Sequence, residues 1–212
     1  MSEYRLYCFA QSGNAYKAAL LMELAGAEWE PVFVDYFHDG SRTPEYREIN
    51  EMGEAPVLEH DGKRLTQSGV LLDYLSQRYR DFGPKSEAER LEILRWTLWD
   101  NHKFTSYIAT WRFITAFVPE EKRDKGVLAF LEGRSRTSLA ILDRHLADRP
   151  FILGDRMTTA DLSCIGYLYF DDEFPIDLPK SPNVLRWRDS IAALPRWKHP
   201  YDLMPGHPIP GS

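Results

Sequence analysis

Cysteine is scarce in this chain, and its placement argues against a metal centre. Cys8 and Cys164 are the only cysteines among 212 residues, and they form neither a C-x-x-C pair nor a spacing typical of metal sites. The six histidines show no i, i+4 ligand pair. We therefore expect no metal site. Because this cysteine usage fits a reducing compartment best, we expect a cytoplasmic location.

The chain also lacks an excess of positive charge and any long apolar run. The formal net charge is −6, with acidic and basic residues mixed along the chain, which argues against a nucleic-acid partner. No run approaches the ~20 apolar residues that a membrane span needs. Residues 1–5 lack the pattern of a secretory signal. With 43% apolar and 13% aromatic residues, the composition is that of a packed globular protein, and we expect no membrane segment.

Strand and helix patterns alternate over the first eighty residues. Strands are expected over residues 4–9 and 30–35 and on both sides of a turn at Asp61-Gly62, and helices over residues 14–24, 43–49 and 67–79. A strand, a helix and a second strand in this order favour a parallel pair with a right-handed crossover. The hairpin then adds two antiparallel strands to the sheet.

The pattern changes after Tyr79. Residues 81–86 have the composition of a linker. From Glu87 onward the patterns are helical with almost no strand signal, and helices are expected over residues 87–117, 120–146, 158–170 and 182–194. The sequence therefore predicts an α/β domain at residues 1–80 and an all-α domain at residues 87–212.

The sequence predicts that a helix begins at Thr158. Thr158 and Asp161 have the spacing of a capping box, and Met157 and Leu162 have that of a hydrophobic staple. We expect this motif to be structural, with the loss of Thr158 or Asp161 costing about 1 kcal/mol of stability.

The most informative segment surrounds Pro56. A proline at the start of a strand cannot donate to the ladder, so it marks an edge or a bend, and a cis bond is one option. A cis bond would turn the backbone of Val57 outward, where an extended peptide could pair with it. Gln67 and Ser68 open the next helix, whose free N–H groups and dipole favour a carboxylate. An ordinary hairpin followed by a capped helix is the alternative.

These features together resemble the cytosolic glutathione transferases. The run Ala55-Pro56-Val57-Leu58 with Gln67-Ser68 is similar to the family's glutathione-binding signature, and the Thr158–Asp161 motif is similar to its capping box. The resemblance covers essentially the whole chain. It implies a thioredoxin-like α/β N-terminal domain followed by an all-α C-terminal domain, with glutathione as cosubstrate and no metal.

The resemblance also assigns residues to the parts of glutathione. Val57, after Pro56, would pair through its backbone with the cysteinyl part, while Gln67 and Ser68 would hold the γ-glutamyl group. Glu54 lies where relatives meet the glycyl carboxylate, which its own carboxylate would repel unless it turns away. His38 or Arg42 would then serve the glycyl end.

Glutathione chemistry needs the thiolate, and a free cysteine thiol has a pKa of ~8.5. Lowering it by two units takes ~2.7 kcal/mol, close to the ~1.5–3 kcal/mol of one hydrogen bond to a charged group. The loop from Ala10 to Lys17 resembles the serine-type loops of theta-like and zeta-like bacterial transferases. The resemblance implies that Ser12 is the donor to the thiolate and Asn14 a second donor. Both residues are also favoured helix caps, and capping alone is the alternative.

In the family, aromatic residues of the helical domain line the pocket for the second substrate. The residues expected here are Phe104, Tyr107, Trp111 and Phe113, although packing in the helical core is the more favoured explanation for any one of them. The resulting expectation is a homodimeric, detoxifying enzyme that conjugates the glutathione thiolate to a hydrophobic electrophile. Two alternatives keep the fold: a glutathione-dependent disulfide reductase and a non-catalytic binding module.

Overall fold

The computed structural model describes residues 2–210 and divides the chain into two compact units. The first unit contains the residues up to Gly83 together with the segment from Leu194 onward, and the second runs from Pro84 to Ala193. The expected helical domain at residues 87–212 is therefore too long, because the last part of the chain packs with the α/β unit. Among residues 2–210, no helix is long and apolar enough to cross a membrane.

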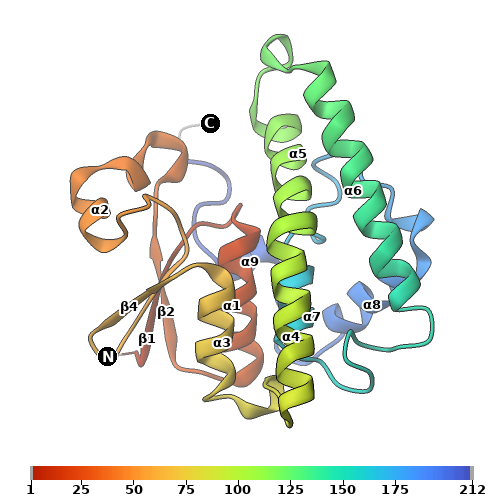
Figure 1. Ribbon diagram of the computed structural model, residues 1–212. Helices are drawn as coiled ribbons and strands as arrows, with labels where there is room; N and C mark the ends of the chain where they lie inside the picture. Colours follow the sequence, from red (N-terminus) through yellow and green to blue (C-terminus); the bar gives the residue numbers. More distant parts are fainter. Residues whose placement is uncertain (1, 211–212) are drawn as a thin grey trace. The chain divides into compact units, whose positions relative to one another are not determined.

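A mixed four-stranded sheet forms the centre of the first unit (Figure 1). Its strands lie in the order β2-β1-β3-β4, with bounds β1 (Tyr4–Cys8), β2 (Trp29–Phe33), β3 (Val57–His60) and β4 (Lys63–Thr66). Strands β1 and β2 are parallel, whereas β3 is antiparallel to both β1 and β4. This confirms the expected parallel pair followed by a hairpin, and it gives the thioredoxin-like arrangement.

The helices of this unit are α1 (Gly13–Ala25), α2 (Pro44–Ile49), α3 (Ser68–Ser76) and the short α9 (Pro200–Leu203). Helix α1 is buried over most of its circumference because alanine and leucine occupy nearly every side, and it packs against α3. Gly26 ends α1 in the left-handed conformation, with φ of 73°, which glycine adopts without steric cost.

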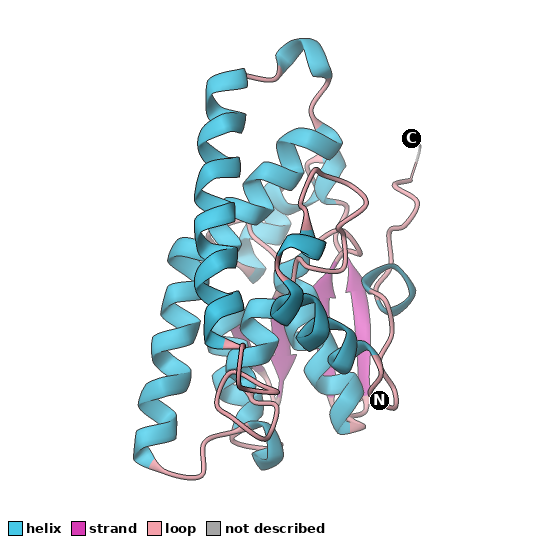
Figure 2. Cartoon of the chain, turned by 90° about the vertical axis from the view of Figure 1, so that its right-hand side faces the viewer, coloured by secondary structure: helices cyan, strands magenta, loops and turns pink. Residues whose placement is uncertain are grey.

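The second unit is helical (Figures 1 and 2). Its helices are α4 (Glu87–Trp99), α5 (Thr105–Phe117), α6 (Lys125–His145), α7 (Thr159–Ile165) and α8 (Pro182–Ala192). The single long helix expected over residues 87–117 is interrupted by a π-helical turn, η4 (Asp100–Phe104). Asp100 is fully buried there, and its carboxylate accepts hydrogen bonds from Thr105 Oγ1 at 2.6 Å and Ser163 Oγ at 2.7 Å.

The capping box at the start of α7 is present as expected. The backbone N–H of Thr158 donates to Asp161 Oδ2 at 2.8 Å. The other oxygen, Oδ1, accepts from the backbone N–H of Ile152 at 2.8 Å and from Trp187 Nε1 at 3.0 Å. Asp161 therefore joins three segments of the helical unit in addition to starting a helix.

Candidate functional site

Ser12 lies in the connection between β1 and α1 and is the N-cap of α1. Its Oγ accepts a hydrogen bond from the backbone N–H of Ala15 at 3.1 Å, and its own N–H donates to the Phe9 carbonyl at 3.0 Å. The capping bond uses only the oxygen of the hydroxyl, so the Ser12 proton can still be donated to another acceptor. Capping and thiolate stabilisation are thus compatible roles for this residue.

Asn14 and Ser68 join the first turns of two helices. Ser68 is the first residue of α3, and its Oγ donates to Oδ1 of Asn14, in the first turn of α1, at 3.4 Å. The N-terminus of a helix carries free N–H groups and a partial positive charge. Two such ends meeting at one point form a site suited to an anion, and Ser12 is the cap of one of them.

Gln67 adopts an unusual backbone conformation next to this junction. Its φ of 70° and ψ of 118° are uncommon for a residue with a Cβ, and such outliers occur preferentially at functional sites. The side chain does not cap α3; instead Nε2 donates to Glu54 Oε2 at 3.0 Å and contacts Met52 Sδ at 3.2 Å. The first N–H groups of α3 are thus left uncapped by this side chain.

The peptide bond between Ala55 and Pro56 is cis, as the strand-initial proline indicated. Val57 follows as the first residue of β3, opposite Tyr7 on β1 and Thr66 on β4. Sequence reasoning missed the groups that hold the backbone of Glu54, the residue before Ala55. The carbonyl of Glu54 accepts from Asn50 Nδ2 at 2.7 Å and from the Tyr46 hydroxyl at 3.0 Å.

The two charged candidates for the glycyl end of glutathione have their own partners. His38, in the 3-10 turn η1 (Tyr36–His38), is exposed, and its Nδ1 lies 2.8 Å from Asp35 Oδ1. Arg42 pairs with Asp39 at 3.0 Å. The structure brings Glu54, Gln67, Ser68, Asn14 and Ser12 into one region through the contacts above, and it gives His38 a contact with Asp35 instead.

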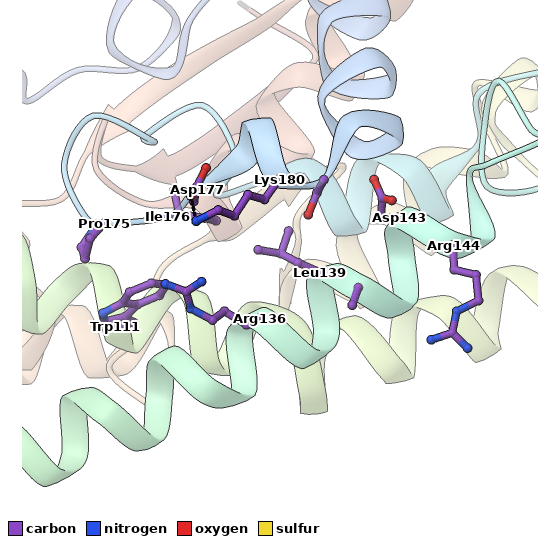
Figure 3. Close-up of a pocket in the computed structure, with 11 residues that line it drawn as sticks. Trp111, Arg136, Leu139, Asp143, Arg144, Pro175, Ile176, Asp177 and Lys180 are labelled. Carbon is purple, nitrogen blue, oxygen red and sulfur yellow. Dashed lines mark ion pairs between the residues drawn. The ribbon is translucent and has the colours of Figure 1, made fainter.

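The four aromatic candidates of the helical unit divide into two pairs. Phe104 is 1% exposed and stacks on Trp99, with ring centroids 5.3 Å apart. Trp111 is 3% exposed and lines a cavity of about 390 Å³ inside this unit, together with Leu139, Ile176 and the charged residues Arg136, Asp177 and Lys180 (Figure 3). Burial of Phe104 and Trp111 favours the core-packing interpretation for both.

Tyr107 and Phe113, by contrast, retain solvent-accessible surface. Tyr107 is half-buried beside Phe130, and Phe113 is 40% exposed beside Phe117. These two have surface open to solvent, whereas the small accessible surface of Trp111 faces the cavity described above.

Neither cysteine presents an exposed thiol. Both are buried, and burial raises the pKa of the Cys8 thiol to about 12. Among residues 2–210, no group of three or more His, Cys, Asp or Glu side chains is arranged to hold a metal ion. Any thiolate chemistry at the Ser12 loop must therefore use a sulfur that a ligand brings.

Two family profiles match the chain. The profile described as "Glutathione S-transferase, N-terminal domain" matches residues 2–77, and the profile described as "Glutathione S-transferase, C-terminal domain" matches residues 107–195. The chain therefore belongs to the glutathione S-transferase family. This confirms the resemblance drawn from the Pro56 and Ser68 segment and the expected fold class.

Individual relatives give the same result. Glutathione S-transferase F14 of Arabidopsis thaliana is 26% identical, covering 99% of this chain and 89% of the relative. The crystal structure of a glutathione S-transferase from Pseudomonas fluorescens Pf-5 has a TM-score of 0.88 at 29% identity, covering 95% of this chain and 100% of that chain. A theta-class glutathione S-transferase from Xanthomonas axonopodis pv. citri, solved with glutathione bound, has a TM-score of 0.85 at 27% identity, covering 92% of this chain and 95% of that chain.

Proposed function

We propose that this protein is a glutathione transferase in which Ser12 stabilises the thiolate of glutathione for attack on a hydrophobic electrophile. The observation that carries the proposal is the position of Ser12 as N-cap of α1, in the same helix turn as the Asn14–Ser68 contact. The solved theta-class relative with glutathione bound supports glutathione as the ligand.

The proposed binding site of the γ-glutamyl carboxylate is the first turn of α3. The N–H groups of Ser68 and Gly69 precede the first intrahelical bonds, which run from Val70 and Leu71 to the Gln67 carbonyl. These donors, the Ser68 hydroxyl and the helix dipole all favour a negative group there. The backbone of Val57 would pair with the cysteinyl part of glutathione, as in the addition of a strand.

For Glu54 we propose a different role from the one that its sequence position suggested. Its carboxylate accepts a hydrogen bond from Gln67 Nε2 at 3.0 Å, and Gln67 is the residue proposed to hold the γ-glutamyl group. Glutathione carries an ammonium group at that end, and Gln67 itself is uncharged. We assign Glu54 to this ammonium, with Gln67 as its hydrogen-bonding neighbour, and keep His38 and Arg42 as the proposed contacts of the glycyl carboxylate.

The chemical step that we propose is a simple substitution or addition. The thiol loses its proton to solvent, the Ser12 hydroxyl donates a hydrogen bond to the sulfur anion, and the sulfur forms a bond to the electrophilic carbon. In a substitution, the leaving group departs with the electron pair of the broken bond; in an addition, the electron pair of the broken π bond moves away from the attacked carbon and takes up a proton from solvent. Tyr107 and Phe113 are the proposed apolar contacts of the electrophile, which would be of the hydrophobic class that such pockets bind.

Calorimetry with glutathione and a substrate panel test the proposal. We expect saturable binding below millimolar glutathione and turnover of aryl halides by the wild-type protein. Ser12→Ala should lower the conjugation rate about tenfold or more and change glutathione affinity only a few-fold. No heat of binding at millimolar glutathione would end the proposal. Turnover of mixed disulfides but not aryl halides would replace conjugation by disulfide reduction.

We also propose that the enzyme is a homodimer in the cytoplasm, with detoxification as its role. Leu91, Leu94 and Leu98 follow one another along α4 and are 52%, 43% and 62% exposed. Large apolar side chains exposed in a row are typical of a surface that a partner covers. Sedimentation should give twice the mass of one chain, and a monomer at micromolar protein would contradict this proposal.

A further inference from the structure

The residues from Leu194 onward, here called the C-terminal segment, contact the rest of the first unit at several points. Helix α9 packs against α1, and the Tyr16 hydroxyl donates to the Lys198 carbonyl at 2.9 Å. Lys198 Nζ lies 2.9 Å from Glu23 Oε1, and Arg196 Nε donates to the Glu23 carbonyl at 2.8 Å. In Figure 1 the blue segment passes α1 at α9 before it runs to the C-terminus.

The same segment then bonds to the loop that carries Ser12. The backbone N–H of Ala10 donates to the Pro205 carbonyl at 2.7 Å, and Gln11 Nε2 donates to the Gly206 carbonyl at 2.7 Å. Ala10 and Gln11 are the two residues directly before Ser12. Gln11 is 5% exposed, so water competes little for its amide. The two bonds hold consecutive residues of the loop against one short stretch of backbone.

The position of the Gly206 carbonyl is itself set by close packing. Gly206 has φ of 97°, which favours glycine, and a Cβ at this position would lie 2.5 Å from Phe33 Cε2 on β2. The next residue, His207, stacks on Tyr201 of α9 with ring centroids 3.6 Å apart. Contacts with β2 on one side and α9 on the other therefore fix the acceptor that Gln11 reaches.

We propose that Gln11 is a positioning residue, through which the C-terminal segment holds Ser12 in the orientation that stabilises a thiolate. This rests on the function proposed for Ser12. A hydroxyl acts on a sulfur anion only from the correct place, and a displacement of about 1 Å can cost about 100-fold in rate. The loop has a local bond from Ser12 N–H to the Phe9 carbonyl, and the C-terminal segment adds a support from the far end of the chain.

Two variants test the hydrogen bond between Gln11 and Gly206, one at the donor and one at the acceptor. Gln11→Met keeps the size of the side chain and removes the donor, whereas Gly206→Ala strains the backbone that carries the acceptor, because φ of 97° is unfavourable for a residue with a Cβ. The matched control is Gln77→Met, because Gln77 Nε2 donates to Asp73 Oδ2 at 3.1 Å on the exposed face of α3. We expect Gln11→Met and Gly206→Ala to lower kcat at neutral pH about tenfold, with KM for glutathione changed less than threefold. The rise of the pH–rate profile should move to higher pH, because the thiolate is less well stabilised. Gln77→Met should change neither quantity.

A second readout needs no glutathione. Ser12→Cys places a thiol at the N-terminus of α1, where the helix dipole lowers the thiol pKa below ~8.5. Its alkylation rate at pH 7 then reports how well the loop is positioned. Adding Gln11→Met or Gly206→Ala should slow this alkylation several-fold, and adding Gln77→Met should leave it unchanged.

The outcomes separate the two proposals. If the wild-type protein binds no glutathione but Gln11→Met still slows alkylation of the introduced thiol, the positioning role stands and the proposed function fails. If Ser12→Ala abolishes conjugation while Gln11→Met and Gly206→Ala change neither the pH–rate profile nor the alkylation rate, the positioning role is wrong. If only one of Gln11→Met and Gly206→Ala folds, the pH–rate profile and the alkylation rate of that variant decide whether the positioning role holds.

Discussion

The hydroxyl of Ser68 donates to the side-chain oxygen of Asn14 at 3.4 Å, which connects the first turn of α3 to the first turn of α1. The residues involved are 54 positions apart in sequence. This contact fixes the proposed carboxylate-binding site on α3 relative to Ser12, the residue proposed to donate a hydrogen bond to the thiolate. Glutathione has its carboxylate and its sulfur a fixed number of bonds apart, so this spacing determines whether both ends can be held together.

Asn14 should therefore affect binding more than chemistry. Asn14→Ala removes the acceptor that orients the Ser68 hydroxyl, and the loss of one hydrogen bond is worth about 0.5–1.5 kcal/mol. We expect KM for glutathione to rise about twofold to tenfold, with a smaller change in kcat, in steady-state kinetics. Asn101→Ala is the control, because this exposed asparagine in η4 donates to the Thr97 carbonyl of the adjoining α4. Equal KM values for wild type and Asn14→Ala would contradict the role.

The charge of Glu54 should help glutathione to bind. Glu54→Gln removes a carboxylate that lies beside Gln67, where the ligand's ammonium is proposed to sit. We expect KM for glutathione to rise about threefold or more, and the effect to weaken at high salt, as expected for a partly exposed charge. Glu51→Gln, on an exposed glutamate of the same loop, should have no such effect. A lower KM for Glu54→Gln would place the carboxylate at the glycyl end instead.

The native thiols should be unreactive. Burial raises the pKa of Cys8 to about 12, so this thiol stays protonated at neutral pH, and Cys164 is buried as well, so a reagent reaches neither side chain directly. Titration with a thiol reagent should find no fast-reacting cysteine in the native protein and two after denaturation. A fast-reacting thiol in the native protein would show that one of these side chains is accessible and would open a second route for thiol chemistry.

Asp161 should contribute more to stability than an isolated helix cap does. Its carboxylate is fully buried and accepts bonds from Thr158, Ile152 and Trp187, so its removal leaves several buried donors without partners. We expect Asp161→Ala to lower the free energy of unfolding by more than a single cap does, with about 1–3 kcal/mol for each buried donor that is left without a partner, measured by urea denaturation. Thr158→Ala, which removes the cap hydroxyl, should cost about 1 kcal/mol. Similar costs for the two variants would mean that Asp161 acts only as a cap.

Local patterns in the sequence were sufficient for much of this structure. The bend at Pro56, the hairpin at Asp61-Gly62 and the capping box at Thr158 all follow from residues within a few positions of one another, although the sequence left the cis bond before Pro56 as one option only. Each of these features is set by backbone sterics or by neighbouring donors and acceptors. The family resemblance then connected them to glutathione.

The features that sequence analysis missed depend on residues that are distant in the chain. The π-helical turn at Asp100 is accompanied by a bond to Ser163, and the bond from Gln11 to Gly206 spans 195 positions. Neither contact leaves a periodic or compositional signal. For the same reason the C-terminal segment was assigned to the helical domain, although its partners are α1 and β2.

The pKa of the glutathione thiol in the bound state tests the central role of Ser12 most directly. It is measured by ultraviolet thiolate absorbance across a pH titration, with glutathione saturating. For the wild-type protein we predict a midpoint about two units below the ~8.5 of a free thiol, and for Ser12→Ala a return of more than one unit toward it. The same midpoint in both proteins, with glutathione bound to each, would contradict the account.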